Sequence, residues 1–173
     1  MATKEINIEI TTDNSNNNNI QKKQIEDTNI IGNPLDTTVA MHYLIFGGVL
    51  ERYPDLKFVL SHGGAFAAAY AGRMDHAYGA RPDCRENISM PPSFYLEKFY
   101  PDSLVFTIEQ LQYLINRFGA DHVLIGTDYP FDMGEYDPVE HVYQVPGLSS
   151  ANRDLICGGN ALRLMHMTED ECK

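Results

Sequence analysis

Two short motifs place residues with metal-binding and acid–base side chains directly after apolar runs. His62 lies in the segment LSHGG at residues 60–64, and Asp128 lies in LIGTDYP at residues 124–130. Imidazole and carboxylate groups bind divalent metals, and imidazole also exchanges protons near neutral pH. Both residue types also occur in loops as purely structural groups, His62 as a capped histidine and Asp128 as a turn former. An active-site role for the two is the first hypothesis to test.

The apolar runs before these residues have the composition of buried parallel strands. Residues 57–61 and 122–125 are short and nearly all apolar, which is typical of strands covered on both faces. A third strand is predicted at residues 99–105, despite Pro101. In barrel enzymes the carboxyl ends of the strands face the active site. His62 and Asp128 are therefore expected to point into one mouth.

Helical segments alternate with these strands. Asp36 or Thr37 is predicted to cap a helix that continues to about Leu50 and ends near the Tyr53-Pro54 pair. Further helices are predicted at residues 65–78, 108–118, 149–157 and 160–167, and a proline-rich loop at 81–94. This alternation predicts an α/β fold. Three β/α units are too few for a closed barrel of about 250 residues, so the expected fold is part of a TIM-type (β/α)8 barrel, comprising about its last three units.

The first part of the chain differs in composition from the rest. Residues 1–31 are rich in asparagine and include the polar run DNSNNNN at 13–19. Such a segment buries too little apolar surface to offset its ordering entropy. A disordered leader is therefore expected over residues 1–31, with a short strand at 6–10 as an exception, and the barrel part over 32–173.

Charge and hydropathy exclude some partners. The chain has 13 basic and 24 acidic residues, a formal net charge of −11, which disfavours nucleic acid and anionic membrane surfaces. No apolar run approaches the roughly 18 residues of a membrane span, and no secretory pattern is present. A cytoplasmic location is expected. Cys84, Cys157 and Cys172 are widely spaced and are expected to be reduced thiols.

A longer series of motifs resembles one enzyme family. The motifs, in order, are GNP at 32–34, TT at 37–38, GGV at 47–49, RYP at 52–54, LK at 56–57, SHGG at 61–64, GR at 72–73, RPD at 81–83, FY at 99–100, DSL at 102–104 and GTDYPF at 126–131. This series resembles the C-terminal part of the aminocarboxymuconate-semialdehyde decarboxylase family, a metal-dependent group in the amidohydrolase superfamily. The resemblance covers residues 32–165.

The resemblance implies roles for four residues. It implies that Asp128 is a ligand of a divalent metal, usually zinc, and that His62 handles protons beside that metal. It implies that Arg73 binds a substrate carboxylate across a dimer interface, and that Phe131 lies near the substrate. A guanidinium binds a planar carboxylate through two hydrogen bonds. A bound divalent metal can lower the pKa of its water ligand to about 7.

Most of the family's zinc ligands are missing from this sequence. No two of the six histidines are two positions apart, so the family's HxH pair is absent, and no histidine precedes His42. A catalytic zinc normally has three protein ligands, so Asp128 alone does not suffice. Ala65 also replaces the last glycine of the family's HGGG motif.

The resemblance implies a zinc-dependent, non-oxidative decarboxylase (a carboxy-lyase) of tryptophan and kynurenine catabolism, with a small carboxylated unsaturated substrate. Three alternatives stay open. The first is a sibling activity, either a hydrolase or hydratase or an aromatic-acid decarboxylase. The second is an inactive fragment that acts only as an interaction partner, and the third is a truncated or misassembled gene product. A homodimer, or pairing with a full-length relative, is expected.

Overall fold

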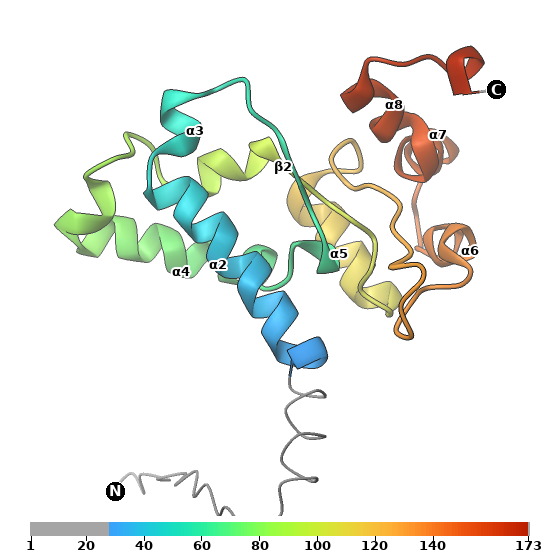
Figure 1. Ribbon diagram of the computed structural model, residues 1–173, viewed down its shortest axis with the longest axis horizontal. Helices are drawn as coiled ribbons and strands as arrows, with labels where there is room; N and C mark the ends of the chain where they lie inside the picture. The colour runs from blue at the N-terminus through green and yellow to red at the C-terminus, as the bar shows by residue number, and fades with distance from the viewer. Residues whose placement is uncertain (1–27, 173) are drawn as a thin grey trace, which may run out of the picture.

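The computed structural model describes residues 28–172 (Figure 1), which form a helix-rich α/β arrangement. The longer helices are α2 (Asn33–Phe46), α4 (Ala67–Ala80) and α5 (Ile108–Phe118). The shorter ones are η1 (Thr28–Gly32), α3 (Val49–Arg52), η2 (His62–Gly64), η3 (Pro82–Arg85), η4 (Pro92–Lys98), α6 (Pro138–Tyr143), α7 (Ser150–Asp154), η5 (Leu155–Gly159), α8 (Asn160–Met165) and η6 (Glu169–Cys172). The strands are β1 (Phe58–Leu60) and β2 (Phe99–Pro101).

The expected leader falls largely outside the described residues. Positions 1–27, including the possible strand at 6–10, are not part of the description. The last four positions of the expected leader, 28–31, belong to η1, which continues into α2. Regular structure therefore begins before the expected boundary at Gly32.

A small parallel sheet organises the centre of the described chain. β1 pairs with β2 in parallel, from Phe58 opposite Phe99 to Leu60 opposite Pro101. A single parallel bridge joins Asp102 to Leu124 beyond the end of β2. β2 therefore lies between β1 and the segment at Leu124.

All three strands are shorter than the sequence predicts, and β1 covers Phe58–Leu60 of the predicted residues 57–61. The segment at 122–125 is reduced to its bridge, because the N–H of Ile125 donates to Ile156 O in η5 at 3.0 Å instead of to a strand. The strand at 99–105 ends after Pro101, because the N–H of Val105 turns back to Ser103 O at 2.9 Å. The described residues therefore contain two short strands and one bridge where the sequence predicts three strands.

Helix α5 has the predicted bounds. The hydroxyl of Thr107 accepts from the N–H of Gln110 at 3.3 Å and caps the helix, and Gly119 ends it with a φ of 92°. Leu111 and Leu114 lie on its buried face. Here the apolar periodicity, the cap and the terminating glycine all agree.

Helix α2 starts earlier and ends earlier than predicted. The predicted caps Asp36 and Thr37 lie inside it, because it begins at Asn33 with Pro34 in its first turn. It ends at Phe46, where Gly48 adopts a φ of 69° and separates α3. A residue with a side chain rarely takes that conformation, so the pair Gly47-Gly48 divides the predicted helix into two.

Two apolar clusters hold the elements together. The first lies among α2, α4 and the sheet and contains Met41, Ile45, Leu50, Leu60, Ala67, Ala71, Ile88, Tyr95, Leu96 and Phe99. The second lies around α5 and contains Ala68, Leu111, Leu114, Ile115, Val123, Val142, Val145 and Ile156. Because α4 contributes to both, it links the two halves of the described chain.

Part of the apolar surface remains uncovered among the described residues. Ile31, Leu35, Val39 and Tyr43 are spaced four residues apart along η1 and α2, and each is at least 40% exposed. Val59 of β1 is 64% exposed. Within residues 28–172, no helix is long and apolar enough to cross a membrane.

Candidate active site

The first arm of the site is the turn that follows β1. His62, Gly63, Gly64 and Ala65 all have positive φ angles, of 59°, 61°, 68° and 52°. Glycine adopts this conformation at no steric cost, whereas His62 and Ala65 do so under strain. A Cβ on Gly63 would lie 2.2 Å from Val105 Cγ1, so that position has no room for a side chain. The SHGG motif thus forms a tight left-handed turn that presents His62 at the strand end.

The imidazole of His62 is held by helix α2. Its Nδ1 lies 3.0 Å from the hydroxyl of Thr37, and that hydroxyl donates to Asn33 O at 3.2 Å. The Thr37 hydroxyl therefore bridges the backbone of α2 and the His62 ring, and it holds the imidazole through Nδ1.

The second arm is the loop that follows the Leu124 bridge. Asp128 has a φ of 56°, and its carbonyl oxygen accepts from the N–H of Phe131 at 2.9 Å. The loop closes where the N–H of Glu135 donates to Thr127 O at 2.8 Å. The carboxylate of Glu135 accepts from the N–H of Asp137 at 3.0 Å and lies 3.3 Å from His141 Nδ1 in α6. These bonds tie the Asp128 loop to α6.

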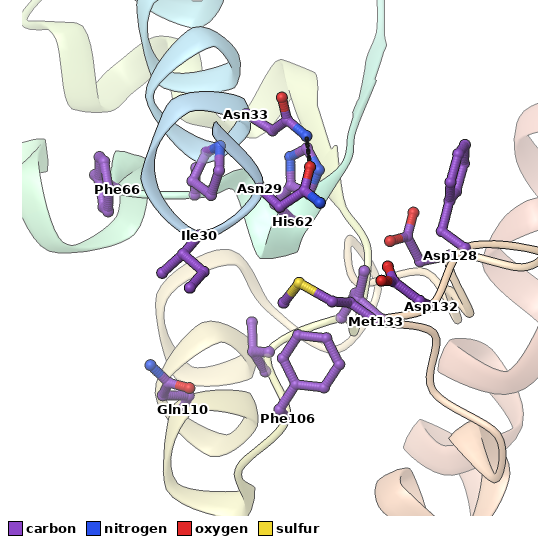
Figure 2. A pocket seen from close by; sticks show the side chains of 15 residues that line it. Asn29, Ile30, Asn33, His62, Phe66, Phe106, Gln110, Asp128, Asp132 and Met133 are labelled. Atoms are coloured by element: carbon purple, nitrogen blue, oxygen red, sulfur yellow. Dashed lines mark hydrogen bonds between the residues drawn. The ribbon is translucent and has the colours of Figure 1, made fainter. Parts of the chain in front are cut away.

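Both arms line one cavity of about 510 Å³, a size typical of small-molecule sites. Figure 2 shows His62 next to α2 on one side, with Asp128 and Asp132 on the other. The remaining lining residues are Asn29, Ile30, Asn33, Pro34, Ala65, Phe66, Leu104, Val105, Phe106, Gln110, Phe131 and Met133. Segments far apart in sequence therefore bring His62 to the same cavity as Asp128 and Phe131.

Arg73 lies elsewhere. It is an exposed residue of α4 and is not among the residues that line this cavity. An arginine that serves a second subunit would have such a position, so its role in substrate binding stays a prediction.

Sequence reasoning missed several contributors to the site. Thr37 belongs to a motif of the family resemblance but was expected to cap a helix, and it contacts His62 instead. Asp132 and Met133 line the cavity directly after the GTDYPF motif. Their closeness to Asp128 in sequence is a signal that could have identified them.

The described residues do not by themselves make a metal centre. Across residues 28–172, no group of three or more histidine, cysteine, aspartate or glutamate side chains is arranged to hold a metal ion. Asp128 and His62 supply two groups at most, whereas catalytic zinc normally takes three protein ligands. Zinc therefore does not fit the described part of this chain alone.

Comparison with known proteins identifies the family. The family described as Amidohydrolase matches residues 30–166. The 2-amino-3-carboxymuconate-6-semialdehyde decarboxylase of Dictyostelium discoideum is 39% identical over 137 residues, covering 79% of this chain and 38% of the relative. The enzyme of that name from Caenorhabditis elegans is 31% identical over 142 residues, covering 82% of this chain and 35% of the relative.

A solved structure supports the same relationship. Dihydroxybenzoic acid decarboxylase from Polaromonas sp., with bound manganese and an inhibitor, superposes with a TM-score of 0.67 at 27% identity. The match covers 77% of this chain and 40% of that one. The chain thus spans about two fifths of the length of the proteins that it matches. On the family match over residues 30–166 and the identity to the two decarboxylases, this chain belongs to the amidohydrolase family.

Proposed function

We propose that this chain supplies one half of the active site of a metal-dependent carboxy-lyase, as the last part of a TIM-type (β/α)8 barrel. The observation that carries the proposal is that His62, in the turn directly after β1, and Asp128, in the loop after the Leu124 bridge, line the same cavity. Active sites of barrel enzymes lie at the carboxyl ends of the strands. The decarboxylase relatives support the reaction type.

In the proposed reaction, His62 acts as the proton carrier. Decarboxylation breaks the bond between carbon and carboxylate, releases carbon dioxide and leaves the electron pair on the substrate carbon. A proton must replace the carboxylate on that carbon. His62 lines the cavity, and an imidazolium there can donate this proton. Thr37 fixes the ring through Nδ1.

Asp128 is proposed as one ligand of a divalent metal. The resemblance implies zinc, and the Polaromonas neighbour carries manganese. Such a metal supplies charge stabilisation to a carboxylated substrate. Its other ligands would come from protein outside the described residues, either in a longer product or on a partner chain.

The proposed substrate is a small, flat, carboxylated and unsaturated compound. Phe66, Phe106 and Phe131 line the cavity and offer aromatic surface to such a molecule. Arg73 is proposed to bind a carboxylate in the site of a second subunit of a homodimer. The names of two relatives suggest two substrate types, a 2-amino-3-carboxymuconate-6-semialdehyde and a dihydroxybenzoate. The first would place the protein in tryptophan and kynurenine catabolism.

A chimera tests the proposal. Residues 30–166 of this chain would replace the corresponding part of the Dictyostelium enzyme, which then supplies the rest of the barrel. We expect the chimera to bind a divalent metal and to release carbon dioxide from one of the two substrates, measured by loss of absorbance. The matched control is the same chimera with His62→Gln. A folded, metal-loaded chimera without turnover on either substrate would overturn the proposal.

A further inference from the structure

Asp102 is a polar residue that the reaction outlined above does not use. It directly follows β2 and forms the parallel bridge to Leu124. Its Oδ1 accepts from the N–H of Gly63 at 2.7 Å and from the N–H of Leu104 at 3.2 Å. The bond to Gly63 joins residues 39 positions apart, so it is a tertiary contact and not a local turn.

The same side chain also touches the second arm of the site. A Cβ built on Gly126 would lie 2.8 Å from Asp102 Cβ and 3.1 Å from its Oδ2. The backbone two residues before Asp128 therefore packs directly on Asp102. The carboxylate lies between the turn that carries His62 and the segment that carries Asp128.

Burial of the Asp102 carboxylate destabilises the fold unless hydrogen bonds replace its contacts with water. Burial raises the pKa of Asp102 above its ordinary value, while the N–H groups of Gly63 and Leu104 and the nearby His62 act in the opposite direction. A buried acceptor that loses its donors is destabilising. In return, the bond to Gly63 restrains a turn in which His62 and Ala65 have strained positive φ angles.

We infer that Asp102 is a positioning residue for His62: its carboxylate fixes the His62-Gly63 turn against the Gly126 backbone, so that His62 and Asp128 face one cavity. The inference deepens the proposed function and rests on it for the effect on turnover. The effect on the turn itself stands on the hydrogen bond and the packing alone.

The first test needs no activity. Nuclear magnetic resonance spectra of the chain, labelled at glycine and histidine, report the Gly63 amide and the His62 ring, assigned with Gly63→Ala and His62→Gln. Asp102→Ala should shift both signals and speed exchange of the Gly63 amide. Asp102→Asn keeps an acceptor oxygen of the same size and should leave both signals near their wild-type positions.

Asp75 provides a matched control. Its Oδ1 accepts from the N–H of Ser93 at 2.8 Å, the same kind of bond between distant segments, and it does not line the His62 cavity. Asp75→Ala should leave the Gly63 and His62 signals in place. Unchanged signals in Asp102→Ala, or equal changes in Asp75→Ala, would overturn the inference.

The second test uses the chimera defined above. Asp102→Ala should lower kcat by about 100-fold per folded molecule, the order expected when a catalytic group moves by about 1 Å, with little change in KM. Asp102→Asn should recover kcat to within about 10-fold of wild type, since its neutral acceptor bonds less strongly. A kcat in Asp102→Ala equal to that in Asp75→Ala would contradict the positioning role. If the unmodified chimera is inactive, the proposed function fails, and the spectra still decide the inference.

Discussion

His62 lines the cavity from a backbone conformation with positive φ, which few residues with side chains adopt. Its φ of 59° and that of Ala65, 52°, are strained, and neighbouring groups must hold them. Thr37 restrains the imidazole and Gly63 gives the turn its close fit against Val105. Ala65 replaces a glycine of the family motif, and its positive φ explains why glycine suits that position.

At the residue scale, alanine variants of His62 and Asp128 should differ in which property they lose, turnover or bound metal. In the chimera, His62→Ala should lower turnover by about 10² to 10⁴ with metal content nearly unchanged, as expected for a general acid–base group. Asp128→Ala should lose the metal, because it removes a ligand. Metal analysis and kcat on the same samples separate the two, with the exposed His42→Ala as control. Equal metal loss in both variants would contradict the role of His62 as a proton carrier that does not hold the metal.

At the element scale, two glycines should respond to alanine with opposite sign. A methyl group on Gly63 meets Val105 Cγ1 at 2.2 Å in a turn with a φ of 61°, so Gly63→Ala should destabilise the chain. Gly72 lies inside helix α4 with open space around its Cβ position. Gly72→Ala should stabilise by about 0.5 to 1 kcal/mol, because alanine is the better helix former. Urea unfolding measures both, and stabilisation by Gly63→Ala would contradict the packing described for the turn.

The tie between the Asp128 loop and α6 should depend on pH. The N–H of Asp137 is the main cause that lowers the pKa of Glu135 below its ordinary value of 4.5, and His141 adds to it. A carboxylate whose pKa is lowered by folding stabilises the fold above the unfolded pKa, and the contribution disappears as pH falls through the folded pKa. Glu135→Gln should therefore be less stable than wild type at pH 7, and the difference should shrink below about pH 4. Equal destabilisation at both pH values, measured by chemical unfolding, would assign the effect to packing instead.

At the scale of the whole molecule, the chain by itself should neither retain one equivalent of zinc nor decarboxylate. The described residues hold no group of three metal-binding side chains, and β1 leaves Val59 and one strand edge uncovered within the described part. Together with the exposed apolar positions of α2, this surface should also make the isolated chain self-associate.

Metal analysis and an absorbance assay on gel-filtered protein, with and without added zinc, test this expectation. The chimera prepared in parallel is the positive control. One equivalent of zinc together with turnover in the chain alone would show that a ligand set exists that the described residues do not reveal.

The sequence by itself determined the elements whose signals are local, together with the family. Helix α5 was predicted with its bounds because its cap, its apolar spacing and Gly119 are all encoded within it. The meeting of His62 and Asp128 was also predictable, because carboxyl ends of parallel strands share one edge.

Only the tertiary structure decided the features that depend on distant partners. Thr37 lies inside helix α2 instead of capping it, and its hydroxyl contacts an imidazole 25 positions away. The third strand is reduced to one bridge, because Ile125 bonds to Ile156 in a helix near the end of the chain. In the sequence, Asp102 is only one residue of the DSL motif. Its contacts with Gly63 and Gly126 form only in the folded chain. A hydrogen-bonding group binds whichever partner the fold brings within about 3 Å, and local sequence does not state which partner that is.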